Sequence, residues 1–239
     1  RILRPEQILQ SLPQAIQTML DPADCGPACI SLSQDVQGEV YEYPEEFFKE
    51  KIHNIRRPRA DDYQIKEAAK KIKKSKNPII ISGGGVFYSD AMEELSNFAT
   101  KHNIPVTQTV MGYSTMKRDH SHFLGPIGGL GGKAANNFAK KTDLAIAVGT
   151  KLGDFTTGSW ANFENPNFGL VSVNITRFDA NKHMAQSVIG DAKVSLNELS
   201  HALGDWKASD EWYKKSRDEL KSWNEYVDKE SGPTNQKLP

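Results

Sequence analysis

Short apolar runs alternate with amphipathic helical patterns through the middle of the chain, and this alternation limits the possible folds most strongly. The apolar runs are almost uninterrupted, which is typical of strands buried on both faces of a parallel sheet. They cover residues 78–82, 104–109, 143–149, 170–175 and 187–190. Helical patterns occupy residues 90–103, 133–141 and 194–203. The sequence therefore predicts a doubly wound α/β domain over residues 77–203, with helices on both faces of a parallel sheet.

The N-terminal segment, residues 1–50, is too poor in elements to form a domain. It carries one helical pattern and one short apolar run, residues 28–32, which predicts a strand. One helix and one strand cannot enclose a core. Because the chain also starts without Met and within a pattern, we expect residues 1–50 to be the C-terminal end of a truncated domain.

Two further segments flank the predicted α/β domain. Residues 51–76 are charged and predict a linker followed by an entry helix, whose lysines alternate with apolar residues and favour a solvated helix face. Residues 204–239 contain a helical pattern with Trp212 and Trp223 on one face. That face either packs back on the α/β domain or belongs against a missing partner.

The charge balance excludes several classes of function. Thirty basic and thirty acidic residues cancel, so no net field favours nucleic acid or an anionic membrane. No apolar run approaches the length of a membrane span, and no signal-peptide pattern opens the chain. We expect a cytoplasmic location. Cys25 and Cys29 lack a second Cys pair or a nearby His, and we expect reduced structural thiols rather than a zinc site.

The stretch PIIISGGGVFYSDAMEEL, residues 78–95, places three glycines between a strand and a helical pattern. A dinucleotide fingerprint needs Gly-x-Gly-x-x-Gly and an acidic residue about twenty positions later. Tyr88 stands at the third glycine position, and the second strand ends without a carboxylate. NAD binding is therefore not predicted. Backbone N–H groups at Gly83 to Gly85 could still approach a pyrophosphate ahead of a helix capped by Ser89, but a turn made for packing is favoured.

Other motifs are incomplete. The loop LGPIGGLGGKAANN differs from a P-loop, because Ile127 and Ala134 occupy positions that require Gly and Ser or Thr. His120 and His122 have no third ligand at metal spacing. Three carboxylates lie at turns near predicted strand ends: Asp119, Asp154 and Asp191. Capping explains them as well as ligand binding does.

A series of motifs in fixed order resembles a known family. NPIIISGGGVFYSDAMEELSNFATKHNIPVTQTVMGYSTM is followed by DHSHFLGPIGGLGG, DLAIAVGTKLGDF and SVIGDA. This series resembles the central domain of thiamine-diphosphate-dependent enzymes of the acetolactate synthase and pyruvate oxidase type. GPACISLSQDVQGEVYEYP is similar to the closing strand of their pyrimidine-binding domain, and the C-terminal helix resembles the segment that leads to their pyrophosphate-binding domain.

Three further stretches resemble one branch of this family in particular. RPEQILQSLPQAI, SQDVQGEVYEYPEEFF and GDFTTGSW are similar to the branch that hydrolyses a C–C bond of a cyclic 1,2-diketone in myo-inositol catabolism. The alternative is a nucleotide-binding or regulatory module of a related enzyme, such as an acetolactate synthase-like lyase.

The resemblance implies that the parent protein binds thiamine diphosphate and Mg²⁺. In the family a glutamate of the pyrimidine domain and a Gly-Asp-Gly motif ending in Asn-Asn hold these groups. Asn136-Asn137 has no Gly-Asp-Gly upstream. We therefore expect no catalytic residue and no metal ligand in this chain. The implied partners are the missing pyrimidine- and pyrophosphate-binding domains and further copies in a homo-oligomer, with no nucleic acid and no membrane.

Some members of the family bind FAD or ADP on the central domain. Asn174-Ile175-Thr176 replaces the Asp-Ile-Asp of flavin-binding relatives, and Lys151 stands where arginine is common. We therefore expect a vestigial or empty nucleotide pocket. Its residues would be Gly83, Gly84, Gly85, Gly112, Gly128, Gly149 and Asp154.

Overall fold

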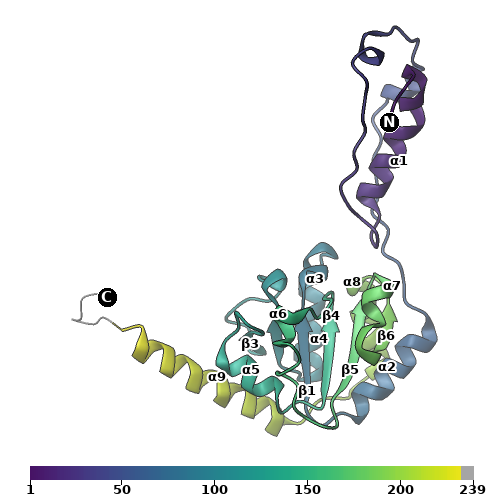
Figure 1. Ribbon diagram of the computed structural model, residues 1–239. Coiled ribbons are helices and arrows are strands. Elements are labelled where there is room, and N and C mark those ends of the chain that lie inside the picture. The colour runs from purple at the N-terminus through teal and green to yellow at the C-terminus, as the bar shows by residue number, and fades with distance from the viewer. Residues whose placement is uncertain (233–239) are drawn as a thin grey trace. The chain divides into compact units, whose positions relative to one another are not determined.

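The computed structural model describes residues 1–232 and divides the chain into two compact units (Figure 1). The first unit is Arg1–Arg57, and the second begins at Pro58. The compact second unit thus includes the helix that the sequence assigns to an entry segment before residue 77. The domain boundaries at residues 50, 76 and 203 stay predictions. Within residues 1–232, every helix is too short or too polar to cross a membrane.

The first unit has little core of its own. It contains η1 (Pro5–Gln7), α1 (Ile8–Leu20), η2 (Val36–Gly38) and η3 (Glu45–Phe48). Helix α1 confirms the helical pattern, but none of its residues is buried. The strand predicted at residues 28–32 is wrong. Only an isolated bridge joins Leu32 to Ile2 in the described part of this unit, and a strand needs a neighbour for its backbone hydrogen bonds.

The second unit is built on a six-stranded parallel sheet in the order β3-β2-β1-β4-β5-β6. The strands are β1 (Pro78–Ser82), β2 (Val106–Gln108), β3 (Phe123–Pro126), β4 (Leu144–Val148), β5 (Gly169–Asn174) and β6 (Gln186–Ile189). This arrangement confirms the predicted doubly wound fold. The chain adds β2 and β3 on one side of β1 and then returns to add β4, β5 and β6 on the other side. The place where the strand order changes, between β1 and β4, is a switch point, and open α/β sheets bind ligands at such points.

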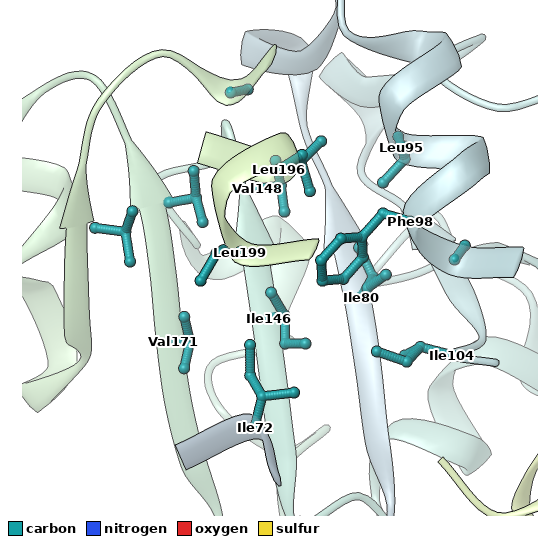
Figure 2. Packing of buried hydrophobic residues seen from close by; sticks show 14 of the residues in the cluster. Ile72, Ile80, Leu95, Phe98, Ile104, Ile146, Val148, Val171, Leu196 and Leu199 are labelled. Carbon is teal, nitrogen blue, oxygen red and sulfur yellow. The ribbon is translucent and has the colours of Figure 1, made fainter. Parts of the chain in front are cut away.

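Helices cover both faces of the sheet (Figure 1). They are α2 (Asp62–Lys74), α3 (Gly84–Tyr88), α4 (Met92–His102), α5 (Lys133–Ala139), α6 (Asp154–Thr157), α7 (Arg177–Ala180), α8 (Ala192–Leu203) and α9 (Asp210–Glu230), with short 3-10 helices η4 (Val110–Gly112) and η5 (Lys182–Met184). Ile80 of β1 joins the core under α2, α4 and α8, as Figure 2 shows. Its neighbours Ile79 and Ile81 join the opposite core, against α5 and α9. The two-residue period of a strand thus supplies both cores from one apolar run.

Helix α2 carries the lysine-rich pattern and packs on the sheet. Asp61 caps it by accepting a hydrogen bond from the Tyr63 N–H. Ile65 and Ile72 are buried and most of the lysines are exposed, whereas Lys71 is partly buried and its ammonium donates to the Leu170 carbonyl at 3.1 Å. The predicted amphipathic helix is therefore present as part of the larger unit.

Helix α9 begins packed on the second unit. Trp212 is 4% exposed and stacks on Phe138 with ring centroids 4.0 Å apart. Its indole N–H donates to the Pro78 carbonyl at 2.8 Å. Trp223 packs against the same core. The tryptophan face therefore packs back on the α/β unit; the last part of segment 204–239, from residue 233, lies outside the described residues.

Candidate functional site

Three glycine-containing loops meet at the carboxyl ends of the central strands. Gly83 to Gly85 follow β1, Gly112 follows β2, and Gly149 follows β4. The Gly83 N–H donates to the Val148 carbonyl and the Gly85 N–H to the Gly149 carbonyl, each at 2.9 Å. The structure thus brings five of the predicted positions together at the switch point between β1 and β4.

Close backbone packing explains why these positions need glycine. Gly149 has φ +61°, and a Cβ there would lie 2.6 Å from the Gly85 Cα. A Cβ on Gly112 would lie 2.2 Å from the Ser82 carbonyl oxygen. Real Cβ atoms do not approach other atoms so closely, so the loops can touch only because these side chains are absent. The glycines therefore hold the loops against one another.

The helix that follows the Gly83 loop is too short to form a strong anion site. Helix α3 has five residues, and the prediction that Ser89 caps the longer helix is wrong. Helix α4 begins after Ala91, while the Ser89 hydroxyl accepts a hydrogen bond from the Ala192 N–H at 3.4 Å. A tight turn at Ser89 and Asp90, which has φ +52°, separates the two helices. The loop therefore lacks the long helix of a dinucleotide fold.

The loop that contains Gly128 contacts α6, the helix that Asp154 begins. Gly128 has φ +102°, and a Cβ on it would lie 2.0 Å from the Phe155 carbonyl oxygen. The same carbonyl accepts a hydrogen bond from the Gly129 N–H at 2.7 Å. Asp154 is the exposed first residue of α6. These contacts fix the loop after β3 against α6.

A buried hydroxyl network lies under the loops and was not predicted. The Ser82 and Thr115 hydroxyls are 2.8 Å apart. Ser82 also donates to the Thr107 carbonyl, and Thr107 donates to the Ile80 carbonyl, both at 3.1 Å. The sequence does carry a sign of this network. Two apolar strands each contain a hydroxyl residue: Ser82 is the last residue of β1, and Thr107 is the middle residue of β2. Because each hydroxyl has an internal partner, the network stabilises the strand ends.

A rim of exposed apolar side chains follows the carboxyl ends of five strands. Its members are Phe87, Tyr88, Val110, Met111, Tyr113, Leu130, Phe155 and Phe178. We call this set the carboxyl-edge rim. Sequence patterns did not reveal it, because apolar residues in loops resemble core residues. Clustered exposed apolar side chains mark surfaces that contact a ligand or another domain.

The paired histidines have structural surroundings. His122 is buried and its Nε2 lies 3.2 Å from the Asn103 Oδ1. Its ring lies 4.6 Å from that of Tyr213 on α9, and 5.7 Å from that of His120. Burial is the main cause that lowers the pKa of His122 from 6.5 to about 4. His122 is therefore a neutral packing residue at neutral pH.

The remaining candidates are a carboxylate that caps a helix and two free thiols. Asp191 caps α8 and accepts from the Lys193 and Val194 N–H groups. Cys25 and Cys29 are exposed and form no disulfide. Over the described part of the chain, no three or more His, Cys, Asp or Glu side chains are grouped to hold a metal ion.

The Asn136-Asn137 pair does not fit a thiamine diphosphate or Mg²⁺ site. Both polar atoms of the Asn136 side chain bond to Gly128, its Oδ1 accepting at 2.9 Å and its Nδ2 donating at 3.0 Å. Asn137 donates to the Glu219 carboxylate at 3.2 Å. These amides bind the chain itself and supply no open set of oxygen ligands.

Comparison with known proteins identifies the family. Residues 65–199 match the family model described as thiamine pyrophosphate enzyme, central domain. A Clostridium perfringens protein named 3D-(3,5/4)-trihydroxycyclohexane-1,2-dione hydrolase is 48% identical over 203 residues, which cover 85% of this chain and 32% of that protein. Proteins of the same name from Clostridium botulinum and Bacillus licheniformis are each 42% identical, over 96% and 87% of this chain and 36% and 33% of their own lengths.

The chain spans about a third of the length of these curated relatives. The matched region runs from α2 to α8 and contains the whole parallel sheet. The resemblance seen in the motifs is thereby confirmed. This chain belongs to the thiamine pyrophosphate enzyme family and contains its central domain.

Proposed function

We propose that the chain is the central scaffold domain of a thiamine-diphosphate-dependent hydrolase that cleaves a C–C bond of 3D-(3,5/4)-trihydroxycyclohexane-1,2-dione, in myo-inositol catabolism. The observation that carries the proposal is 48% identity, over 85% of the chain, to a relative named for hydrolysis of this cyclic diketone. The parent protein works in the cytoplasm as a homo-oligomer.

The role as a scaffold is supported by how the strand ends use their polar groups. Gly83 and Gly85 direct N–H groups to carbonyls of the β4 strand and loop, and Ser82 and Thr115 bond to each other. These groups hold loops in place. The thiamine diphosphate and Mg²⁺ are held outside the chain, by the pyrimidine- and pyrophosphate-binding domains that are its expected partners.

Activity of the parent protein tests the substrate. The full-length protein that contains this segment, supplied with thiamine diphosphate and Mg²⁺, should open the ring of trihydroxycyclohexanedione, and the product can be followed by chromatography. Condensation of 2-oxo acids without ring opening would refute the hydrolase and favour the lyase alternative.

Calorimetry tests the location of the cofactor. We expect titration of residues 1–239 with thiamine diphosphate and Mg²⁺ to give no heat of binding, because Asn136 and Asn137 are already bonded within the chain. Binding at micromolar concentration would contradict the scaffold role.

A second candidate function is nucleotide binding at Gly83, Gly84, Gly85, Gly112, Gly128, Gly149 and Asp154. The observation in its favour is that the first three, with Gly112 and Gly149, lie at the switch point, where ligands bind in such sheets. The internal hydrogen bonds of Gly83 and Gly85 favour an empty site instead. Thermal unfolding with FAD or ADP separates the two, because only a ligand that binds the folded state raises the unfolding temperature.

A further inference from the structure

Lys71 differs from the other lysines of α2 because its side chain is partly buried against the sheet of the second unit. Its ammonium donates a hydrogen bond to the Leu170 carbonyl at 3.1 Å, near the start of β5. Gly169 leaves room for this contact, since a Cβ there would lie 3.0 Å from the Lys71 Cε and 3.5 Å from the Leu144 Cδ1. The amino group therefore lies against backbone and apolar atoms.

No carboxylate pairs with the Lys71 ammonium within residues 1–232. Glu67, one helical turn earlier, pairs with Lys70 at 3.5 Å instead. Asp143, which precedes β4, accepts hydrogen bonds from residues 75–77. In the described part of the chain, the bond to a neutral carbonyl is thus the only polar contact of this ammonium.

Partial burial without a counter-ion favours the neutral amine of Lys71. Removal from water disfavours a charged group more than a neutral one, and burial lowers the pKa of Lys71 below its ordinary value. At a given pH, a larger fraction of Lys71 is therefore neutral than of an exposed lysine. Only the neutral amine has the lone pair that attacks an electrophile. In that form one N–H still donates to Leu170, and the lone pair is directed away from the carbonyl.

Helix α2 also determines the charge of the electrophile that fits. Its thirteen residues include five lysines and two acidic residues. The surface around Lys71 therefore attracts anions. Acyl phosphates combine an activated carbonyl carbon with negative charge, so they are concentrated at this helix relative to neutral acyl donors.

We propose that Lys71 is a site of acylation by acyl phosphates. The Nζ lone pair attacks the carbonyl carbon of the donor and forms a C–N bond. The bond from that carbon to the phosphate oxygen breaks, and phosphate leaves with the electron pair. The nitrogen gives up one proton, which phosphate or water accepts. The product is a neutral amide that keeps one N–H for the Leu170 carbonyl, so the fold tolerates the modification.

Acetylation of residues 1–239 by acetyl phosphate near neutral pH tests this proposal. The matched control is Lys73 on the same helix, whose ammonium also donates to a backbone carbonyl, that of Ala202 at 2.9 Å, but whose side chain is exposed. Cleavage after glutamate leaves both lysines on one peptide, residues 68–93, and fragment-ion mass spectrometry gives the initial rate at each. We expect Lys71 to react about 3- to 10-fold faster than Lys73, because more of it is neutral.

Two further measurements separate the effect of the fold from that of the local sequence. In guanidinium chloride, where the chain is unfolded, Lys71 and Lys73 should react at equal rates because the burial is lost. In the folded chain, the rate at Lys71 should level off at a lower pH than the rate at Lys73, because its amine becomes fully neutral earlier.

Either of two results overturns the proposal. If the folded chain acetylates Lys71 no faster than Lys73, burial shields the amine rather than activating it. If the preference for Lys71 persists in the unfolded chain, the local sequence causes it and the contact with β5 does not. Circular dichroism under the labelling conditions shows which samples are folded.

Discussion

Single glycines decide how the loops at the strand ends pack, and two adjacent glycines test this point. Gly128 and Gly129 are neighbours in the loop after β3. A Cβ on Gly128 meets the Phe155 carbonyl oxygen at 2.0 Å at a positive φ, whereas one on Gly129 approaches no atom closer than 3.9 Å. The two positions therefore differ in space and in backbone conformation.

We predict that Gly128→Ala lowers the free energy of unfolding by about 2–4 kcal/mol, because overpacking adds to an unfavourable φ. Gly129→Ala should change it by less than about 0.5 kcal/mol. Urea unfolding measures both. Equal effects of the two substitutions would show that the close approach at Gly128 relaxes without cost.

His122 makes the stability of the second unit dependent on pH. Burial, followed by the charges of His120 and Arg217, lowers its pKa from 6.5 to about 4 in the folded chain. Between these values the unfolded chain binds more protons than the folded one, so stability falls as the pH falls. The stabilisation is complete above pH 6.5 and is lost progressively down to about pH 4.

We predict that His122→Gln removes a pH-dependent loss of up to about 3 kcal/mol between these limits. Urea unfolding at several pH values gives the slope. The control is His201→Gln, which alters an exposed histidine of α8, leaves His122 in place and should therefore keep the loss of stability that His122 causes. If His122→Gln keeps the full slope, other groups cause the acid sensitivity; His102 and His120, whose pKa values burial also lowers, are the first to examine.

At the scale of elements, the packing of α9 on the second unit depends mainly on one tryptophan. Trp212 is buried against Phe138 and donates its indole N–H to Pro78. We predict that Trp212→Ala lowers the free energy of unfolding by about 3–5 kcal/mol, as for other large buried side chains. Trp223→Ser, at a partly buried site on the same helix, should cost clearly less. If urea unfolding shows a similar loss of unfolding free energy for both substitutions, Trp212 is not the main contact between α9 and the core.

Most elements of the sheet could be predicted because their side chains face two cores. Ile79 to Ile81 are buried on both sides, and such an apolar run is visible in the sequence. Strand β3 was missed because its four residues include Gly125 and Pro126, which are typical of turns. It occupies an edge of the sheet, where proline is tolerated.

The candidate site could be predicted only in part. Glycines after strands are visible in the sequence, and the loops after β1, β2 and β4 do meet. The contact of Gly85 with Gly149 depends on the pairing of β1 with β4, which no local pattern encodes. The carboxyl-edge rim was missed for a different reason, since hydropathy does not tell an exposed Tyr88 or Met111 from a buried one.

At the scale of the whole molecule, the two units differ in how much stability they can have. Ile2 and Val36 are the buried hydrophobic residues of the first unit, whereas two cores enclose the sheet of the second. We predict that residues 58–239 alone unfold cooperatively at nearly the same temperature as the whole chain, because burial of apolar surface dominates stability. Calorimetry of both chains checks this. A large drop in the unfolding temperature on removal of residues 1–57 would contradict it.

The central place of β1 has a consequence for how the protein is made. Strand β1 pairs with β2 on one side and with β4 on the other, yet the ribosome releases β1, β2 and β3 before β4. Until then the nascent chain exposes an isoleucine-rich strand with a row of unbonded amides and carbonyls, which can recruit other unfinished chains. Co-expression of chaperones that bind this partly folded chain should therefore raise the yield of recombinant protein.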